Sequence, residues 1–411
     1  MSGNPKMRKI TKLLTYLFLF YPLYFISRLT PRNNKNWVIG SKKNFSCNSK
    51  YFFINFYIEN NNSDINLIWI TPNKQLSHLL KSNGYKSEYK YSIRGLYYLL
   101  TAKVYITSYG SQYDLSYWTS GNTLLVYLWH GVGIKNINYS SDTPVMRKIY
   151  HSSHIIDKIA YSPYREKPDI FLSTSEFMNN HFSKAFNIPL SNIITSSYPR
   201  CSIFKMKSAD VINNIKSFEL SYEFRLLEKA SIFDNLILYM PTWRDNDDNF
   251  MEKAIPNYHK LNDVLLATNS LFIIKLHPNT ELKDNKNYSN IVFIKNDIDP
   301  YPILYYTNLL ITDYSSIYYD YLLKENYKTL LYPFDIALYS KTCRDLAYPY
   351  DEFTSGDKVY TFDELVLFLS KINTNAEFSN SEKIKEIFFQ PHNKKQDIKT
   401  EIIKKLNYEN Q

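Results

Sequence analysis

The sequence predicts an α/β protein that is built from two doubly wound domains. Short apolar runs alternate with longer helical patterns along almost the whole chain, and such repeated β–α units favour parallel sheets covered by helices. The chain has 411 residues, of which 44% are hydrophobic, so it is too long for one ordinary core and apolar enough to fold. Two sets of β–α units therefore predict two domains that face each other across a cleft.

Each set of units can be followed along the chain. In the first half, strands are expected at Trp37–Gly40, Ile65–Ile70, Lys103–Ile106, Leu124–Leu128, Ile170–Ser173 and Asn192–Thr195. Helical patterns lie between them at Asn73–Asn83, Arg94–Thr101, Pro144–Ala160 and Glu176–Phe186. In the second half, strands are expected at Leu236–Met240, Leu271–Lys275, Ile291–Ile294, Leu309–Thr312 and Leu330–Tyr332. The helices of that half are expected at Ser208–Lys229, Lys260–Ala267, Ile317–Lys324, Phe362–Lys371 and Ser381–Phe389.

The domain boundaries follow from breaks in this pattern. A proline and several polar residues interrupt it near Ser197–Ser208. We therefore expect an N-terminal segment at residues 1–34, a first domain at residues 35–205 and a second domain at residues 206–411.

Positive charge is concentrated at the N-terminus. Before the first acidic residue, Glu59, there are ten basic side chains: Lys6, Arg8, Lys9, Lys12, Arg28, Arg32, Lys35, Lys42, Lys43 and Lys50. The rest of the chain carries 39 basic and 39 acidic residues, so the net charge of +10 is a local feature. This distribution argues against a nucleic-acid partner.

An apolar and aromatic run, Leu13–Ile26, lies within this basic region. Its 14 residues are short for a bilayer span, which needs about 20, and Pro22 would interrupt a spanning helix. We expect an interfacial anchor on an anionic membrane surface, and a helix packed on the core is the alternative.

Cysteine and glycine usage narrows the chemistry. The three cysteines, Cys47, Cys201 and Cys343, are odd in number and far apart, so they form neither a disulfide framework nor a metal site, which fits a reducing cytoplasm. With 9 glycines and no GxGxxG or GxxxxGK[ST] pattern, a glycine-rich phosphate loop is not expected.

Four strand ends carry polar residues, at the edge where doubly wound sheets bind ligands. His130 follows the strand at Leu124–Leu128, where it suits proton transfer or a hydrogen bond within its own loop. Arg244 follows another strand and can grip a phosphate bidentately or form a surface salt bridge. His277 ends a third strand, and Pro278 fixes the loop that follows it.

The fourth strand end reads Asp313-Tyr314-Ser315-Ser316 and precedes a helical pattern. Ser315 and Ser316 either cap that helix or bind a phosphate at its start, where backbone N–H groups are unpaired. Since a carboxylate repels phosphate, Asp313 is expected to orient a ribose, a hydroxyl or a histidine. Asp335, Asp351 and Glu352 further on can bind polyol hydroxyls or cap helices.

These motifs together resemble the CDP-glycerol glycerophosphotransferase family, which includes teichoic-acid primases and polymerases and related capsule polymerases. The resemblance rests on Trp129-His130-Gly131, Pro241-Thr242-Trp243-Arg244, Lys275-Leu276-His277-Pro278 and Thr312-Asp313-Tyr314-Ser315-Ser316, in this order, with Tyr332–Asp335 and Asp351–Gly356 downstream. It implies a GT-B fold of two Rossmann-like domains, with the acceptor on the N-terminal one and the CDP-polyol donor on the C-terminal one.

The resemblance also implies site roles. His130 would be the general base and His277 a second catalytic residue; Thr242, Arg244, His277, Asp313, Ser315 and Ser316 would bind the donor. Gly131, Lys135 and Arg200 would lie on the acceptor side. There the chain departs from the family, since Val132-Gly133-Ile134 precede Lys135 and Cys201-Ser202 follow Arg200. These departures leave the acceptor's identity open.

The expected reaction is attack of an acceptor hydroxyl on the β-phosphorus of CDP-glycerol, with CMP as the leaving group. We expect no metal and no cofactor, a lipid-linked or glycan acceptor, and a peripheral location on the cytoplasmic face of the membrane. The alternatives are a CDP-ribitol donor, a GT-B nucleotide-sugar glycosyltransferase, and a membrane-associated glycan-binding scaffold without activity.

Overall fold

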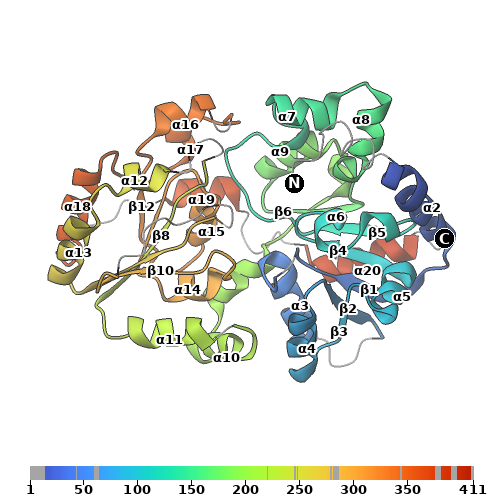
Figure 1. The fold of residues 1–411 in the computed structure, drawn as a ribbon, viewed down its shortest axis with the longest axis horizontal. Coiled ribbons are helices and arrows are strands. Elements are labelled where there is room, and N and C mark those ends of the chain that lie inside the picture. Colours follow the sequence, from blue (N-terminus) through green and yellow to red (C-terminus); the bar gives the residue numbers. More distant parts are fainter. Residues whose placement is uncertain are drawn as a thin grey trace, which may run out of the picture. The chain divides into compact units, whose positions relative to one another are not determined.

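A computed structural model describes residues 14–42, 44–59, 64–219, 221–244, 247, 249–277, 280, 287–342, 345–374, 381–389 and 396–408. These residues divide into two units, each with its own parallel sheet (Figure 1). Unit 1 contains the described residues of Met1–His130, Ile137–Arg200 and Gln390–Gln411, and unit 2 those of Gly131–Asn136 and Cys201–Phe389.

Unit 1 is built on a seven-stranded parallel sheet with the order β3-β2-β1-β4-β5-β6-β7. Its strands are β1 (Asn33–Ile39), β2 (Asn66–Thr71), β3 (Ser87–Tyr89), β4 (Ala102–Thr107), β5 (Leu124–Tyr127), β6 (Ile170–Ser173) and β7 (Ile193–Thr195). Its longer helices are α3 (Cys47–Glu59), α4 (Lys74–Ser82), α5 (Ile93–Thr101), α9 (Glu176–Phe186) and α20 (Ile398–Tyr408). The shorter ones are α6 (Ser111–Asp114), α7 (Pro144–Met146) and α8 (Ile155–Ala160).

Unit 2 has a six-stranded parallel sheet with the order β10-β9-β8-β11-β12-β13. Its strands are β8 (Asn235–Met240), β9 (Ser270–Ile274), β10 (Ile291–Phe293), β11 (Leu309–Thr312), β12 (Thr329–Leu331) and β13 (Asp357–Lys358). Its helices are α10 (Ser208–Phe218), α11 (Ser221–Ala230), α12 (Phe250–Ala254), α13 (Tyr258–Ala267), α14 (Tyr301–Tyr306), α15 (Ile317–Tyr321), α16 (Ile336–Thr342), α17 (Tyr350–Phe353), α18 (Phe362–Ser370) and α19 (Glu382–Phe388).

Apolar strand residues form the core of unit 2. Ile237, Phe272 and Ile311 come from three adjacent strands and are fully buried against Leu265 of α13 and Leu369 of α18. The two helices lie side by side on one face of the sheet (Figure 1). A parallel sheet buries both faces, which is why its strands appear in the sequence as continuous apolar runs. The prediction of an α/β fold with parallel sheets is confirmed.

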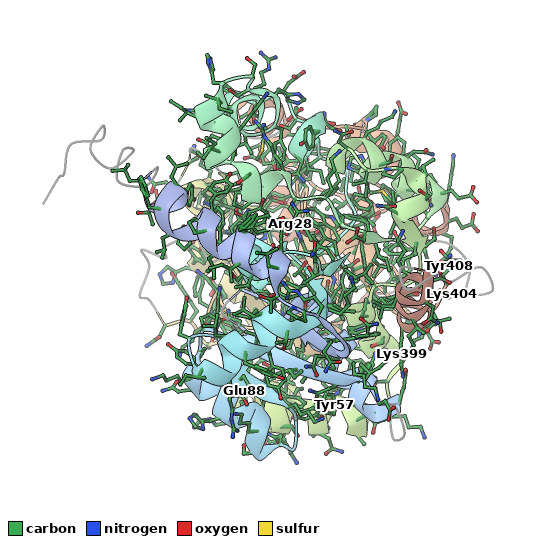
Figure 2. All side chains as sticks on the ribbon, turned by 90° about the vertical axis from the view of Figure 1, so that its right-hand side faces the viewer. Arg28, Tyr57, Glu88, Lys399, Lys404 and Tyr408 are labelled. Carbon is green, nitrogen blue, oxygen red and sulfur yellow. The ribbon has the colours of Figure 1, made fainter. Side chains whose placement is uncertain are left out.

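The two units differ from the predicted domain ranges, 35–205 and 206–411, since the boundary lies between Arg200 and Cys201 and two further segments belong to the other unit. The described residues from 396 onward belong to unit 1, because the Gln396 N–H donates to the Thr195 carbonyl and the Gln396 side chain accepts from the Thr195 N–H. Figure 2 shows α20 by its labelled residues Lys399, Lys404 and Tyr408. In addition, Gly131–Asn136 belongs to unit 2.

Three predicted helices are shorter or broken. The pattern at Pro144–Ala160 forms α7, a π-helical turn at Arg147–His151 and α8 instead of one helix. The pattern at Ser208–Lys229 is split into α10 and α11, and the helix after Ser316 is α15, which has only five residues. Without the predicted length, α15 has only a weak dipole at its start.

The described part of the N-terminal segment forms a π-helical turn, η1 (Tyr16–Phe20), and α2 (Tyr21–Leu29), with Pro22 in the first turn. One side packs on unit 1: the Phe20 ring stacks on Trp118 with centroids 5.0 Å apart, and Tyr24 stacks on Tyr117. No helix in the described part of the chain combines the length and the apolar character that a membrane crossing requires. Lys6, Arg8, Lys9, Lys12, Leu13, Lys43, Pro278 and Cys343 lie outside the described residues.

Candidate active site

The strand order of unit 2 places a ligand crevice between two loops. In doubly wound sheets, ligands bind beyond the carboxyl ends of the strands, where the strand order reverses. That reversal lies between β8 and β11, so a ligand crevice is expected between the loops Pro241–Arg244 and Asp313–Ser316. Two of the motifs found in the sequence therefore meet at one place.

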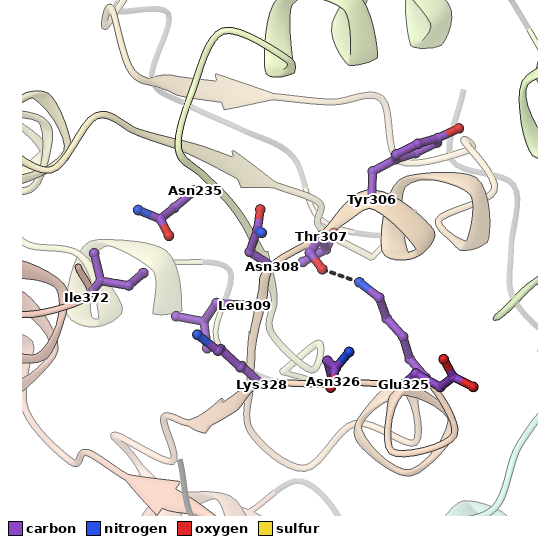
Figure 3. Close-up of a pocket in the computed structure, with 10 residues that line it drawn as sticks. Asn235, Tyr306, Thr307, Asn308, Leu309, Glu325, Asn326, Lys328 and Ile372 are labelled. Atoms are coloured by element: carbon purple, nitrogen blue, oxygen red, sulfur yellow. Dashed lines mark hydrogen bonds between the residues drawn. The ribbon is translucent and has the colours of Figure 1, made fainter. Parts of the chain in front are cut away.

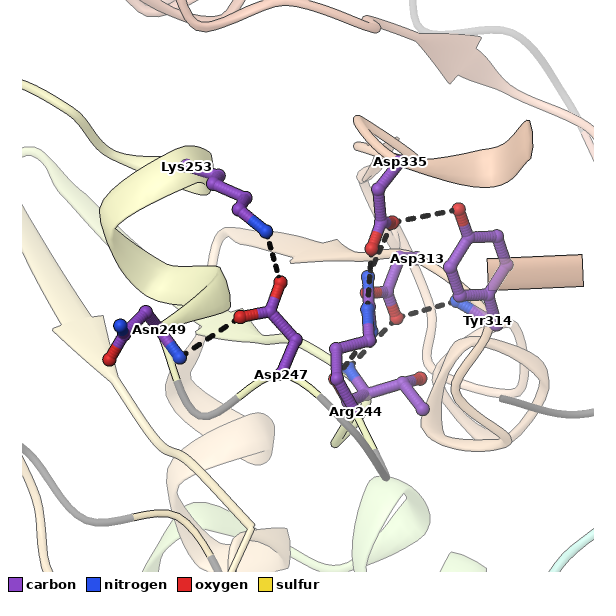
Figure 4. A network of polar contacts seen from close by, with 8 residues as sticks. Arg244, Asp247, Asn249, Lys253, Asp313, Tyr314 and Asp335 are labelled. Atoms are coloured by element: carbon purple, nitrogen blue, oxygen red, sulfur yellow. Dashed lines mark hydrogen bonds and ion pairs between the residues drawn. The ribbon is translucent and has the colours of Figure 1, made fainter. Parts of the chain in front are cut away.

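A buried ion-pair cluster joins these two loops (Figure 4). The Arg244 side chain is 1% exposed, and its Nε and Nη2 donate to the two Asp335 carboxylate oxygens, both at 2.7 Å. Nη2 also donates to Asp313 Oδ2 at 2.9 Å, and Nη1 donates to the Thr242 carbonyl. Burial disfavours the guanidinium charge, but Asp313 and Asp335 outweigh it and raise the pKa of Arg244. The cluster is closed by Tyr314, whose hydroxyl donates to Asp335 Oδ1.

This cluster revises the expected roles of Arg244 and Asp313. A bidentate grip on phosphate requires two parallel N–H groups, and Arg244 uses its Nε–Nη2 fork on Asp335. The Asp313 carboxylate accepts from Arg244 and from the backbone N–H groups of Thr242 and Tyr314. Arg244, Asp313 and Asp335 thus connect the crevice-forming loops and set their shape. The sequence signal for Asp335 was the Tyr332–Asp335 motif, but its partner was not predictable.

Hydroxyl and imidazole groups of the predicted site remain at the crevice. Thr242 Oγ1 is buried and has no hydrogen-bond partner in the described part of the chain. His277 is exposed, and its ring stacks on Trp243 with centroids 5.7 Å apart, which links the loop after β9 to the loop after β8. Ser315 and Ser316 are half-buried; Ser316 makes no side-chain cap, and Ser315 Oγ accepts from the Ile317 N–H at 3.4 Å.

The segment that follows His130 packs within unit 2. The Asn136 N–H donates to the Asp345 carbonyl, and the Ala347 N–H donates to the Ile134 carbonyl, which makes a short antiparallel pairing. A Cβ on Gly133 would lie 4.0 Å from the Ser316 Cβ, and the Lys135 ammonium lies 5.5 Å from the centre of the Tyr339 ring. The predicted acceptor-side residues Gly131 and Lys135 therefore belong to the same unit as the donor motifs.

In unit 1, His130 follows β5 with a defined hydrogen-bonding pattern. Its Nδ1 lies 3.2 Å from the Ser108 carbonyl oxygen, which only accepts, so Nδ1 carries the proton and Nε2 carries the lone pair. Its ring stacks on Tyr109 with centroids 4.6 Å apart. Burial lowers the pKa of His130 to about 3, and the positive charges of Arg200 and Lys42 act in the same direction. The imidazole is therefore neutral at physiological pH.

Two buried side chains hold the backbone around His130. Asn48, at the start of α3, donates through Nδ2 to the carbonyls of Leu128 and Trp129, at 3.0 and 2.9 Å. Its Oδ1 accepts from the Arg200 N–H, and Arg200 Nη1 donates to the His130 carbonyl at 3.0 Å. Arg200, predicted on the acceptor side, thus supports the histidine loop. Asn48 was not predicted, because the mostly buried residues of α3 show no helical period that would mark it as the start of a helix.

The structure also contains a cavity of about 300 Å³ in unit 2, remote from these residues (Figure 3). It is lined by Asn235, Asn308 and Leu309 at the amino ends of β8 and β11, together with Lys324. The Lys324 ammonium donates to the Thr307 carbonyl, and burial lowers its pKa to about 8. The cavity lies at the opposite edge of the sheet from the motifs and is not the candidate site.

Among the described residues, no group of three His, Cys, Asp or Glu side chains is placed to hold a metal ion. Cys47 and Cys201 are buried free thiols.

The arrangement of the two units indicates the class of protein. A group-transfer enzyme with two substrates requires a base that can take a proton and donors that bind the transferred group. Unit 1 contains such a base, and unit 2 contains the hydroxyl and imidazole groups. The fold and the site therefore define a two-unit α/β transferase.

Comparison with known proteins identifies the family. The model of the CDP-glycerol:poly(glycerophosphate) glycerophosphotransferase family matches residues 22–401, so the chain belongs to this family. It is 26% identical over 389 residues to the teichoic acid poly(glycerol phosphate) polymerase of Bacillus spizizenii, covering 91% of this chain and 93% of that protein. The teichoic acid poly(ribitol-phosphate) polymerase of the same organism is 25% identical, covering 92% of this chain and 57% of that protein.

Solved structures confirm the fold. The wall teichoic acid polymerase TagF matches with a TM-score of 0.64 at 19% identity, covering 93% of this chain and 90% of that one. A TagF variant matches with a TM-score of 0.66 at 17% identity, covering 98% of each chain. The resemblance seen in the sequence motifs is thereby confirmed at the level of family and fold.

Proposed function

We propose that this transferase moves glycerol phosphate from CDP-glycerol to an acceptor hydroxyl and releases CMP, in the synthesis of a teichoic-acid-like or capsule polymer. Membership of the family supports this reaction, as do the poly(glycerol phosphate) polymerase of B. spizizenii and the TagF structure obtained after a soak with CDPG. The observation that carries it is the hydrogen bond from His130 Nδ1 to Ser108, because it leaves Nε2 as a proton acceptor at a strand end.

Each part of the site has a role in the proposed reaction. Nε2 of His130 takes the proton of the acceptor hydroxyl as its oxygen attacks the β-phosphorus. Negative charge then grows on the phosphoryl oxygens and on departing CMP, where positioned donors lower the barrier most. His277, the Thr242 hydroxyl and the hydroxyls of Ser315 and Ser316 are the proposed donors. Arg244 and Asp313 act by positioning the loops.

We further propose that unit 1 takes the acceptor and unit 2 the CDP-polyol donor, with the two meeting in a GT-B cleft. His130 of unit 1 would then deprotonate the acceptor, while Gly131 and Lys135, which belong to unit 2, would lie with the donor motifs. No step of this mechanism needs a metal ion, so EDTA should leave turnover unchanged, and a loss of turnover that magnesium restores would disprove it.

The N-terminal segment is proposed to hold the enzyme on an anionic membrane surface at the cytoplasmic face. The side of η1 and α2 turned away from the packed rings exposes Phe18 by 77%, Phe25 by 64% and Leu29 by 69%. Arg28, labelled on α2 in Figure 2, adds a positive charge to the same helix. Exposed aromatic residues with basic neighbours are typical of interfacial helices.

The reaction is tested by incubating the protein with CDP-glycerol or CDP-ribitol and a panel of acceptors, while CMP and product length are measured. CMP release that depends on CDP-glycerol and on an acceptor is expected. His130→Ala should lower the rate at least about 10²-fold, the usual scale for a general base. Absence of donor-dependent CMP release in the parent would favour a non-catalytic glycan-binding scaffold, and an unchanged rate in His130→Ala would refute the role of His130 as the base.

A CDP-ribitol donor is the second candidate. It is favoured by the match to the poly(ribitol-phosphate) polymerase, and the CDP half of both donors would make the same contacts. The same assay decides, since CMP would then appear with CDP-ribitol and not with CDP-glycerol. Turnover with a nucleotide sugar alone would point to a glycosyltransferase instead.

A further inference from the structure

The strand order of unit 1 marks a second place where a ligand crevice is expected. The order β3-β2-β1-β4-β5-β6-β7 reverses between β1 and β4, so a ligand is expected beyond the carboxyl ends of these two strands. The loop after β1 contains Ser41 and Lys42, and the loop after β4 contains Ser108 and Tyr109. The next strand in the sheet, β5, leads to His130, so this crevice adjoins the proposed base.

Lys42 and His130 lie against the same aromatic ring. The Lys42 ammonium is 4.2 Å from the centre of the Tyr109 ring, and the His130 ring centre is 4.6 Å from it. The distance from the ammonium to the centre of the imidazole ring is therefore at most the sum of these two distances. Its positive charge acts on His130, where it lowers the pKa of the imidazole.

Lys42 is exposed and makes no ion pair within the described part of the chain, where its ammonium contacts the rings of Tyr109 and Tyr113 and its charge also acts on the carboxylate of Asp114. The nearby carboxylate of Asp114 is buried and accepts from the N–H groups of Lys42, Ser108 and Tyr109. That carboxylate holds the two loops together. A ligand can thus meet the Lys42 charge without displacing a partner.

Ser41 is a second, independent sign of a polar ligand. The residue is 3% exposed, and its hydroxyl has no hydrogen-bond partner in the described part of the chain. Buried hydroxyls are nearly always hydrogen-bonded in folded proteins, so one without a partner in the loop that carries Lys42 marks a place where a bound group can supply it.

We propose that this crevice binds a phosphodiester of the acceptor, with Lys42 as its cationic contact, and that Lys42 thereby selects acceptors that already carry a polyol phosphate next to the reacting hydroxyl. The inference rests on the proposed function and deepens it. It makes the chain an enzyme that extends a polyol-phosphate acceptor in preference to one that adds the first unit to a neutral sugar.

The dimensions of such an acceptor fit the arrangement. In a glycerol phosphate chain, three carbon atoms with bonds of about 1.5 Å separate the terminal hydroxyl from the nearest phosphate. When that hydroxyl is hydrogen-bonded to Nε2 of His130, the phosphate lies within one glycerol unit of the imidazole. The Lys42 ammonium lies against the same Tyr109 ring as the imidazole and is therefore close to that distance from it.

The test compares two synthetic acceptors that end in the same glycerol. In one, a phosphodiester joins this glycerol to the rest of the molecule, and in the other, a neutral ether does. Binding is measured without donor by titration calorimetry, and transfer is measured as CMP release with CDP-glycerol. The variants are Lys42→Ala and Lys42→Arg, with Lys35→Ala as the control, since Lys35 is an exposed lysine at the opposite end of β1 that pairs with Asp64.

Loss of one charge-assisted contact should weaken binding of the phosphodiester acceptor about 10-fold or more in Lys42→Ala. Binding of the ether acceptor and the KM for CDP-glycerol should stay unchanged, Lys42→Arg should retain most of the binding, and Lys35→Ala should behave like the parent. Equal effects on both acceptors, or no effect on either, would overturn the proposal. Acceptor binding is measured without donor, so it tests the role of Lys42 independently of turnover. Absence of CMP release in the parent would disprove the proposed function, and the binding data would still decide on Lys42.

Discussion

The Arg244 cluster makes the sharpest prediction, because it separates a positioning role from a phosphate-binding one. Replacing Asp335 by Asn keeps the size of the side chain but removes its charge and one of the two acceptors used by the Arg244 fork. Removing one partner from a buried ion pair typically costs about 3–5 kcal/mol. Since Asp313 still faces the guanidinium and the new amide would keep one acceptor oxygen, the expected loss lies near the lower end, about 3 kcal/mol.

The matched control is Asp363→Asn, whose carboxylate pairs with Lys260 on the surface and is 82% exposed. Such exposed pairs contribute about 0.2–1 kcal/mol. Urea unfolding is followed by hydrogen exchange in peptides that cover β8 and β11, which reports on unit 2 without assuming that both units unfold together. If Asp335→Asn costs no more than Asp363→Asn, the cluster does not stabilise the loops, and the reasoning fails.

Arg244→Lys distinguishes the two roles in the same assay. A lysine cannot reproduce the planar fork, so a positioning role predicts a loss of stability together with a higher KM for the donor. A phosphate-binding role predicts the change in KM with stability unchanged.

Three further predictions concern other parts of the chain. The pKa of His130 in the folded protein is about 3, below its ordinary value of 6.5, so the unfolded chain binds the proton more readily. The stability contributed by His130 should therefore be full above about pH 6.5 and decline as the pH falls toward 3. Thermal unfolding of His130→Phe, measured over the same pH range, should show a smaller decline. Asn48→Ala leaves without a partner three backbone groups that the Asn48 amide now satisfies. Steady-state kinetics should then show a lower kcat with the KM for CDP-glycerol unchanged. Equal changes in kcat and in KM would contradict this role. Replacing Phe18 and Phe25 by Ser removes apolar contact with the membrane worth about 1.5–3 kcal/mol for each ring. The affinity for anionic vesicles, measured by co-sedimentation, should therefore fall at least about 10²-fold, while CMP release in solution persists. Undiminished co-sedimentation would refute the anchor.

The parallel strands could be predicted from the sequence because burial on both faces leaves a continuous apolar run, as at Ile170–Ser173 and Leu309–Thr312, which the structure reproduces residue for residue. The edge strands β3 and β13 could not, since they are short and contain Glu88, Asp357 and Lys358. Helix α3 gave no helical signal, because most of its residues are buried and it has no polar face to create a 3.6-residue period.

The candidate site was predictable in its residue types and not in its partners. A polar residue after an apolar run marks the carboxyl end of a strand, which identified His130, Arg244, His277 and Asp313. Whether Arg244 faces a ligand or a carboxylate depends on Asp335, which lies 91 positions further along the chain. Likewise, no pattern around His181 predicts that α9 buries it, and burial lowers its pKa to about 4.

The same topological rule places chemistry in both units, with different results. In unit 2 the loops at the strand-order reversal are joined through a buried arginine and two carboxylates, which fixes them before any ligand arrives. In unit 1 the corresponding loops are joined through Asp114, and the nearby cation, Lys42, stays at the surface. A preorganised crevice suits the developing charge of phosphoryl transfer, where donors must not reorganise. An exposed lysine on a flexible stem suits the proposed polyol-phosphate acceptor, because it holds a phosphate by charge without a fixed geometry.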